Sequence, residues 1–288
     1  MTDLVHALSE ALPFVTRLTG KTIVVKIGGS TLGSNDTTLQ DAVTLKNLNI
    51  DVVIVHGGGA AITEWLGRIN KKAEFVNGLR VTDSETMDVV TMTLAGKVNK
   101  DLVSQIQASG GKAVGLSGVD GGILRGQVKD PRLGAVGEVT EVHAELIRMI
   151  SSSGYIPVIA PIALGEGTQL LNLNADTAAA EVAVALGAHK LIFLTDVTGI
   201  KGTDGALIPE LNEREATDLI ASGVIAGGMI PKAAASVRAL DGAEQAHIID
   251  GRQSHALIRE LFTDLGVGTM ITRARNSTAN LATGVGSA

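Results

Sequence analysis

The chain has 288 residues, of which 45% are hydrophobic and 2% aromatic, and its formal net charge is −6. With no long basic run and almost no aromatic side chain for bases to stack on, nucleic acid is not an expected partner. The absence of cysteine excludes disulfides, zinc–thiolate sites and thiol nucleophiles. No run approaches the roughly 18 apolar residues of a membrane span, and no signal-peptide stretch opens the chain, so we expect a soluble cytoplasmic protein.

Residues 3–18 place leucine and valine at helical spacing, which predicts an amphipathic helix with one apolar stripe. Pro13 should kink or divide this helix, because proline lacks the N–H that continues the hydrogen-bond ladder. The stripe needs burial, either on the body of its own subunit or against a neighbouring subunit. The segment that carries this stripe, residues 1–20, precedes the first expected strand.

From residue 21 onwards, buried strand-like runs alternate with helices. The expected strands are Thr22–Ile27 and residues 51–55, 112–116, 156–159, 191–194 and 247–249. The expected helices are one through Trp65, one at about 85–109 and one at about 141–153, and the glycine-rich residues 120–140 should form a hairpin or loop excursion. This alternation predicts an α/β fold whose mostly parallel sheet is covered on both faces. The tail from about residue 272 is expected to be poorly ordered.

Two of the expected strands end in glycines. The first is followed by Gly28 and Gly29, and the second by the run His56-Gly57-Gly58-Gly59. Because glycine lets backbone N–H groups approach an anion closely, each loop predicts an anion cradle. Neither loop matches the P-loop, the Rossmann pattern or the esterase nucleophile elbow.

Two lysines occur where a cation needs a partner. Lys26 lies inside a strand that otherwise reads as buried, which is costly unless its ammonium reaches an anion at the strand's carboxyl end. The alternative is a lysine that extends to solvent from an edge strand. Lys232 follows Pro231 in the first turn of a helix predicted to end at Gly242, where the helix dipole disfavours a cation. A bound phosphate would reverse that penalty, and a solvated lysine is the alternative.

Polar side chains gather before an alanine-rich helix that Gly187 should close. Asn172 and Asn174 are two residues apart, so on an extended segment they share one face, which a polar ligand would explain. Asp176 is a natural N-cap for that helix. Elsewhere, Arg80 offers a planar fork suited to a carboxylate, with a surface salt bridge as the ordinary alternative.

Together these strings resemble the amino acid kinase family from about residue 21 to residue 271. The resemblance rests on Lys-Ile-Gly-Gly at 26–29, His-Gly-Gly-Gly at 56–59, Asn-Ala-Asp at 174–176 and Thr-Asp-Val-Thr-Gly-Ile at 195–200. Asn-Gly-Leu-Arg-Val-Thr at 77–82, Asn172 and Gly-Met-Ile-Pro-Lys at 228–232 narrow it to members that phosphorylate N-acetyl-L-glutamate in arginine biosynthesis. The first loop departs from many relatives in reading Ile27-Gly28-Gly29-Ser30. The resemblance implies an open αβα sandwich, with an acyl-amino-acid lobe at about 21–175 and an ATP lobe at about 176–271.

The resemblance also implies roles. Lys26 and Lys232 would stabilise the transferring phosphoryl group, and Asp176 would hold both lysines in place. The implied substrate-binding residues are Gly58, Gly59, Arg80, Asn172 and Asn174. The implied nucleotide-binding residues are Gly28, Gly29, Asp196, Val197, Gly199, Ile200, Lys201, Val224 and Ala226. ATP would be the phosphoryl donor, with Mg²⁺ bound through phosphates and water rather than by protein ligands.

The N-terminal segment resembles that of arginine-inhibited, hexameric members, in which an extra helix links dimers. This implies L-arginine as an inhibitor, a homo-oligomer built as a trimer of dimers, and a PII-type regulatory protein as a candidate partner. The arginine site would consist of Phe14, Lys190, His255, Glu260, Gly266 and Gly268, with Glu260 pairing with the guanidinium. Phe14 stands where a tyrosine often occurs, so a hydroxyl contact would be missing and inhibition weaker.

Two alternatives stay open. A kinase of the same fold could act on a carrier-linked or free amino acid, although a net charge of −6 does not favour docking of an acidic carrier. A non-catalytic arginine-sensing module is a different class, against which the presence of both lysines and Asp176 counts.

Overall fold

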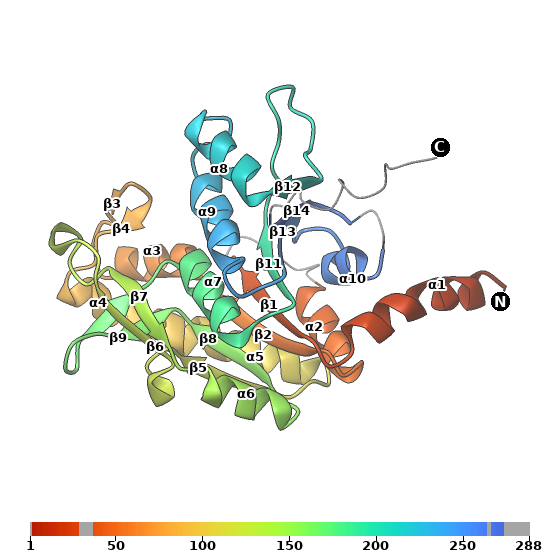
Figure 1. Cartoon of the computed structure of the whole chain (residues 1–288). Coiled ribbons are helices and arrows are strands. Elements are labelled where there is room, and N and C mark those ends of the chain that lie inside the picture. Colours follow the sequence, from red (N-terminus) through yellow and green to blue (C-terminus); the bar gives the residue numbers. More distant parts are fainter. Residues whose placement is uncertain (1, 29–36, 264–265, 274–288) are drawn as a thin grey trace, which may run out of the picture.

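The computed structural model describes residues 2–28, 37–263 and 266–273 (Figure 1). Gly29, Ser30 and the tail from residue 274 lie outside these ranges. The helices are α1 (Thr2–Leu18), α2 (Thr38–Asn47), α3 (Gly59–Arg68), α4 (Ser84–Thr91), the π-helix η1 (Met92–Val98), α5 (Asn99–Ala108), the short 3₁₀ turns η2 (Asp120–Gly122) and η3 (Pro131–Leu133), α6 (Glu145–Ser152), α7 (Ala175–Leu186), α8 (Glu213–Ala221), α9 (Met229–Ala239) and α10 (Ala256–Leu261).

Three sheets contain the strands. The large sheet has the order β12-β14-β13-β11-β1-β2-β8-β5, and all its neighbouring pairs are parallel except β13 with β14. Its strands are β1 (Thr22–Ile27), β2 (Asp51–His56), β5 (Ala113–Ser117), β8 (Ile156–Ala160), β11 (Lys190–Thr195), β12 (Glu210–Asn212), β13 (Gln245–Asp250) and β14 (Thr269–Thr272). The second sheet has the order β10 (Leu170–Asn172), β9 (Ile162–Leu164), β6 (Leu124–Val128) and β7 (Gly137–Val142). The third sheet pairs β3 (Phe75–Val76) with β4 (Leu79–Arg80).

All six expected strands are confirmed, most of them longer or shifted by one or two residues. The prediction of a hairpin in 120–140 is confirmed by the antiparallel pair β6–β7. The helix expected at 141–153 begins only at Glu145, because the alternating polar and apolar residues before it belong to β7. The helix expected at 85–109 is α4, η1 and α5 in succession.

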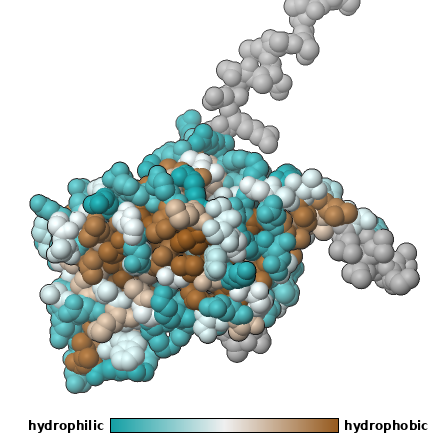
Figure 2. Space-filling model, turned by 90° about the horizontal axis from the view of Figure 1, so that it is seen from below, coloured by the Kyte–Doolittle hydropathy of each residue, from teal (hydrophilic) through white to brown (hydrophobic). Residues whose placement is uncertain are grey.

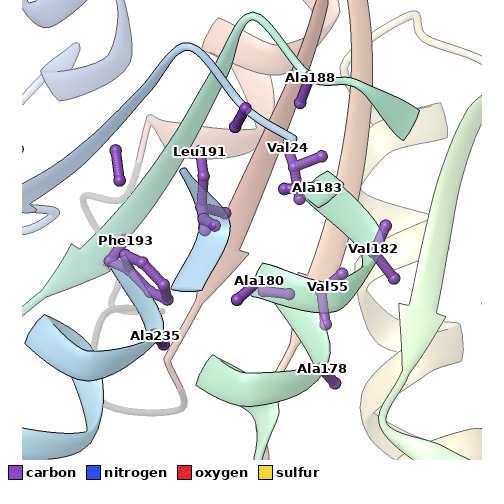
Figure 3. Packing of buried hydrophobic residues seen from close by; sticks show 14 of the residues in the cluster. Val24, Val55, Ala178, Ala180, Val182, Ala183, Ala188, Leu191, Phe193 and Ala235 are labelled. Carbon is purple, nitrogen blue, oxygen red and sulfur yellow. The ribbon is translucent and has the colours of Figure 1, made fainter. Parts of the chain in front are cut away.

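Each central strand sends alternate side chains to two different cores. Val24, Val53 and Val55 belong to one core, which α7 and α9 cover, whereas Ile23, Val25 and Ile54 belong to the other, covered by α2, α5 and α10. Figure 3 shows the first of these, where the alanines of α7 pack with Val24 and Val55. The small side chains of α7 let the helix lie close to β1, which fixes its amino end over the carboxyl end of that strand.

Helix α1 extends outward from the body of the molecule (Figure 1). Of the two expected effects of Pro13, division of the helix does not occur: the helix runs through to Leu18, which is fully buried against the second core. The hydrogen bond from Thr19 N to Val15 O, 2.9 Å, keeps the last turn closed beyond the proline. Within the part of the chain that the structure describes, no helix is long and apolar enough to cross a membrane.

Candidate active site

Three charged side chains meet at the carboxyl edge of the large sheet. Lys26, near the end of β1, shares the face of Val24, and this face lies under α7. Its Nζ lies 2.7 Å from Asp176 Oδ1, and Nζ of Lys232 on α9 lies 3.1 Å from Asp176 Oδ2. Since β1 is flanked by β11 and β2, Lys26 does not extend from an edge strand. The solvated interpretation of Lys232 is likewise wrong, because its side chain is 23% exposed and paired.

Asp176 is 4% exposed, and among the described residues it is the only carboxylate that forms an ion pair with either of these two ammonium groups. Burial alone would raise the pKa of Asp176, but the charges of Lys26 and Lys232 outweigh it and hold the pKa below its usual value. The carboxylate therefore stays ionised and fixes both lysines. The position also favours a negative charge, because it lies in the first turn of α7.

The sequence suggested Asp176 as the N-cap of α7, and this prediction is wrong. The cap is Asn174, whose Oδ1 accepts hydrogen bonds from the N–H groups of Asp176, 2.9 Å, and Thr177, 3.1 Å. This exchange of roles frees both carboxylate oxygens of Asp176 for the lysines. The helix that carries Lys232 also ends earlier than expected, at Ala239 rather than at Gly242.

A cavity of about 240 Å³ opens beside this ion cluster. It is lined by Lys26 and Asp176, by Gly28 and all three glycines after His56, and by Arg80, Asn172 and Asn174. Every substrate-binding residue implied by the sequence therefore borders one space. Gly29 lies outside the described residues.

Arg80 enters this cavity from β4. Its Nη2 donates to Gly59 O at 2.8 Å and to Thr63 Oγ1 at 2.9 Å, and the guanidinium carbon stacks 4.7 Å from the ring centre of Phe75. Its Nη1 is buried and has no hydrogen-bond partner among the described residues. Burial also lowers the pKa of Arg80, although a guanidinium stays charged. The surface salt-bridge interpretation is therefore wrong, and a free donor remains for an acidic ligand.

Asn172 is joined to Arg80 through one hydroxyl group. Its Nδ2 donates to Thr82 Oγ1 at 3.1 Å, and that hydroxyl donates to the carbonyl of Arg80 at 2.7 Å. Thr82, fully buried, was not singled out in the sequence, since a threonine two residues after an arginine carries no distinctive signal.

A second cavity follows the carboxyl ends of β11 and β13. It is lined by Asp196, Val197, Gly199, Ile200, Lys201, Val224 and Ala226, together with Met229 and Arg252. The predicted nucleotide residues other than Gly28 and Gly29 thus lie together. Arg252 was missed, although its place just after a parallel strand is where ligand-binding residues gather. It forms two hydrogen bonds of 2.9 Å with the carboxylate of Asp250.

The first turn of α9 connects the two cavities. Met229 lines the second cavity, and Lys232, one turn further on, reaches Asp176 at the wall of the first. A phosphate chain that extended from the second cavity towards the first would therefore meet two ammonium groups. This arrangement can neutralise charge, and no His/Asp pair for proton abstraction lines either cavity among the described residues.

Most of the residues implied for arginine binding line a third cavity between α1 and the second half of the chain. Phe14, Lys190, Glu260, Gly266 and Gly268 line it, with Arg17 and His247. His255 does not, contrary to expectation: its Nδ1 lies 2.7 Å from Asp41 Oδ1, and its N–H donates to Thr37 Oγ1. The positive φ of His255, 56°, turns the chain in that direction.

Glu260 is already engaged in this structure. Its Oε1 lies 2.6 Å from His247 Nδ1, and its Oε2 accepts from the N–H of Val267 at 2.6 Å. Lys190 Nζ lies 3.1 Å from His247 Nε2, and burial lowers the pKa of Lys190 to about 8. A guanidinium that paired with Glu260 would therefore have to compete with His247 for Oε1.

Comparison with known proteins gives three consistent results. Residues 21–250 match the amino acid kinase family. An acetylglutamate kinase of Nostoc sp. is 48% identical over 281 residues, which are 95% of each chain. Among solved structures, an N-acetylglutamate synthase from Neisseria gonorrhoeae complexed with coenzyme A and N-acetyl-glutamate has a TM-score of 0.84 and 28% identity, and this chain spans 64% of its length. The same synthase complexed with coenzyme A and L-arginine has a TM-score of 0.79 and 27% identity, with 94% of this chain and 65% of that chain covered.

Proposed function

The chain belongs to the amino acid kinase family, and we propose that it transfers the γ-phosphoryl group of ATP to the side-chain carboxylate of N-acetyl-L-glutamate, an N-acetylglutamate 5-kinase reaction of arginine biosynthesis. The observation that carries this proposal is the near-full-length similarity to acetylglutamate kinase. The charges and donors around the glycine-lined cavity supply the chemistry that the reaction requires.

The acceptor is already a nucleophile, because a carboxylate is ionised at neutral pH. Catalysis then requires positioning and neutralisation of the charge on the transferring group rather than a general base. In our proposal, Lys26 and Lys232 contact the phosphoryl oxygens, and Asp176 keeps the two ammonium groups at their places. The N–H groups of the two glycine loops complete the cradle, as helix and loop amides do for anions.

The acyl amino acid is proposed to lie between the glycine loop and β4. The unpartnered Nη1 of Arg80 would receive the α-carboxylate, and Asn172 would donate to the acetamido end. ATP is proposed to lie in the second cavity, with its phosphates directed along the first turn of α9.

Mg²⁺ would neutralise the β- and γ-phosphates and be held by phosphate oxygens and water. Within the described ranges no group of three or more His, Cys, Asp or Glu could hold a metal ion, and oxygen ligands from phosphate and water suit Mg²⁺. Asp176, the buried carboxylate that borders the first cavity, is paired with two lysines.

The test is a coupled ATP assay with a panel of acceptors, in which the acyl phosphate is trapped with hydroxylamine. We expect turnover of N-acetyl-L-glutamate to exceed that of free glutamate, aspartate and UMP. Faster turnover of a carrier-linked or free amino acid would transfer the assignment to another kinase of this fold. No turnover of any acceptor, with arginine still bound, would favour the non-catalytic sensing module instead.

We further propose that L-arginine binds in the cavity beside α1 and inhibits the enzyme. The support is the acidic Glu260 at the base of that cavity and the arginine complex of the structurally similar synthase. In this proposal the guanidinium displaces His247 from one oxygen of Glu260. Isothermal titration with wild-type protein and with Glu260→Gln tests the site, since the variant keeps the volume but loses the charge.

The assembly is proposed to be a homo-oligomer. Strand β5 is an edge of the large sheet, and Figure 2 shows apolar side chains gathered on the underside of the molecule within a hydrophilic rim. The outward course of α1, with Leu12 59% exposed, also calls for a partner surface. We propose that the apolar underside forms a dimer interface and that α1 links three dimers into a hexamer. The cytoplasm is the expected location.

Deletion of residues 1–19 separates these contacts. We expect light scattering to show that the shortened protein is a dimer. We also expect the kinase assay to show that it is active and that arginine no longer inhibits it. An intact protein that is already dimeric and insensitive to millimolar arginine would refute both the hexamer and the regulation. A pull-down with a PII-type protein is the corresponding test for that partner.

A further inference from the structure

A buried imidazole lies directly beneath the second glycine loop and touches neither cavity. His56 is the last residue of β2 and is fully buried. Because side chains alternate along a strand, it lies on the face of Ile54, opposite to the face that carries Lys26. That face is covered by α5, whose first residue, Asn99, is also fully buried. The proposed reaction gives neither residue a role.

The contacts of His56 fix which nitrogen carries the proton. Nδ1 lies 2.9 Å from the carbonyl oxygen of Gly57, which can only accept, so Nδ1 is the donor. Nε2 lies 3.2 Å from Nδ2 of Asn99, which donates. Burial lowers the pKa of His56 to about 4, and the charge of Lys100 acts in the same direction, so the ring is neutral at physiological pH.

Asn99 is itself held in one orientation. The two hydrogens on its Nδ2 are shared among three acceptors, which are the carbonyl oxygens of Val158, at 2.9 Å, and Leu116, at 3.2 Å, and His56 Nε2. Its Oδ1 accepts from Lys100 Nζ at 2.9 Å. A reversed amide would present its oxygen to two carbonyls, so the network admits only one arrangement. Gly115 makes room for it, since a Cβ there would come within 1.9 Å of Asn99 Oδ1.

The π-helix η1 brings this residue into place. A π turn holds about one residue more than an α turn, which rotates the residues after it by roughly 100° relative to an unbroken α-helix. Before the π turn, Val90 packs in a cluster with α3, and after it Leu102 packs under the large sheet beside Asn99. Leu94, within η1, also closes the space beneath Gly58, where a Cβ would come within 2.5 Å of its Cδ2.

Since the carbonyl oxygen and the following N–H point in opposite directions across a trans peptide, holding Gly57 O beneath the loop directs the N–H of Gly58 to the cavity side. The N–H of Gly57 is fixed as well, by a 2.8 Å bond to Ile27 O. We infer that His56, oriented by Asn99, is a positioning residue that fixes the Gly57–Gly58 peptide for contact with the transferring phosphoryl group. This inference rests on the role proposed above for the glycine loop.

The test compares three substitutions at His56 by steady-state kinetics with ATP and N-acetyl-L-glutamate. His56→Leu keeps the bulk but frees the Gly57 carbonyl, and we expect kcat to fall about 10- to 100-fold, the scale of a small misplacement of a catalytic group. KM for both substrates should stay within about threefold of wild type. His56→Asn places an amide N–H near the position of Nδ1 and should restore kcat to within about fivefold of wild type. If His56→Leu does not fold, His56→Gln, whose amide reaches towards Asn99 instead, should show the same loss.

Three results would overturn the inference. The first is a kcat of His56→Leu or His56→Gln within about threefold of wild type. The second is an equal loss of kcat in His56→Asn and His56→Leu. The third is the loss of one limb of the pH profile of kcat in His56→Asn, which would indicate acid–base catalysis. His143→Leu, at a partly exposed histidine after β7, is the control and should leave kcat unchanged. Failure of the wild-type enzyme to phosphorylate the substrate would instead refute the proposed function, so the two are distinguishable.

Discussion

Replacing Asp176 by asparagine removes one negative charge from between two ammonium groups while preserving the shape of the side chain. In the wild-type protein the two carboxylate oxygens lie 2.7 Å from Lys26 Nζ and 3.1 Å from Lys232 Nζ. The asparagine can accept from one lysine, but its NH₂ group then faces the other, and two cations share one buried site. At least one ammonium must move away from the position at which it would meet the phosphoryl group.

The size of the effect follows from this geometry. Loss of one correctly placed charge partner in the transition state lowers kcat by roughly 10²–10³, and we expect Asp176→Asn to fall in this range. Removing one partner of a buried pair costs about 3–5 kcal/mol of stability. Because the side chain of Lys232 is 23% exposed and can turn to water, only Lys26 is left uncompensated. We therefore expect the lower end, about 3 kcal/mol.

Kinetics and urea unfolding at pH 7 measure both quantities. Asp218→Asn makes the same chemical change on the exposed face of α8, where the carboxylate is 72% exposed, and serves as the control with unchanged kcat. KM should change little in Asp176→Asn if, as we propose, the lysines contact the transferring group chiefly in the transition state. A kcat within about threefold of wild type would refute the claim that Asp176 organises the lysines.

The same variant has a pH signature. The folded-state pKa of Asp176 lies below the ordinary value of 3.8, so its contribution to stability is present above that value and is lost as the pH falls through the folded-state pKa. The stability difference between wild type and Asp176→Asn should therefore be constant near neutrality and shrink below about pH 4. A difference that stayed constant down to pH 2 would contradict an ionised, lysine-paired carboxylate.

Three further predictions follow from single contacts. Lys26→Ala and Lys232→Ala should each lower kcat by roughly 10²–10³ with little change in KM, and a kcat of Lys232→Ala within about threefold of wild type would exclude its role. Arg80→Lys keeps the charge but loses the planar fork, so KM for the amino acid should rise at least about tenfold while kcat changes less, as kinetics with varied N-acetyl-L-glutamate will show. Burial lowers the pKa of Lys190 to about 8, so between pH 8 and 10.5 the unfolded chain binds more protons than the folded protein. The free energy of unfolding of the wild type, measured with urea relative to Lys190→Met, should therefore rise with pH across that window. A difference that does not change with pH would count against a buried amine.

The central strands could be predicted because each is a run of β-branched residues bounded by glycine or polar residues. Thr22–Ile27, for example, is buried on both faces, and a short run of β-branched residues that ends at two glycines is typical of a buried parallel strand rather than of a helix. The lysine inside it could be singled out for the same reason. Its partner could not be derived from spacing, because Asp176 follows about half a chain later and meets Lys26 only through the sheet order. That pairing came from the resemblance and is confirmed by the distances.

Local patterns failed where two interpretations share the same letters. Asn174 and Asp176 both favour helix N-caps, and only the course of the chain after β10 makes Asn174 the cap and leaves Asp176 for the lysines. The π-helix could not be read from the sequence, because no pattern in Met92–Val98 distinguishes a π turn from an α turn, and its extra residue accompanies packing against two different clusters. The short strands β9 and β10, with three residues each, are too brief for a period of two to be read. The division into two lobes at residue 175 stays a prediction, since one sheet runs through both parts.

The pleat of the sheet explains how the glycine loop after β2 can face the cavity on one side and contact His56 on the other. Lys26 pairs in register with Val55, and Ile27 with His56, so the last side chains of these neighbouring strands alternate between the two faces. The face under α7 therefore receives Lys26, for which we propose contact with the phosphoryl group, and the opposite face receives His56, for which we propose the positioning of the loop. A register shift of one residue in β2 would send His56 to the lysine's face and leave the Gly57 carbonyl without its donor. The buried valines and isoleucines of β2, which admit only one register, thus set the geometry of a polar cavity that none of them lines.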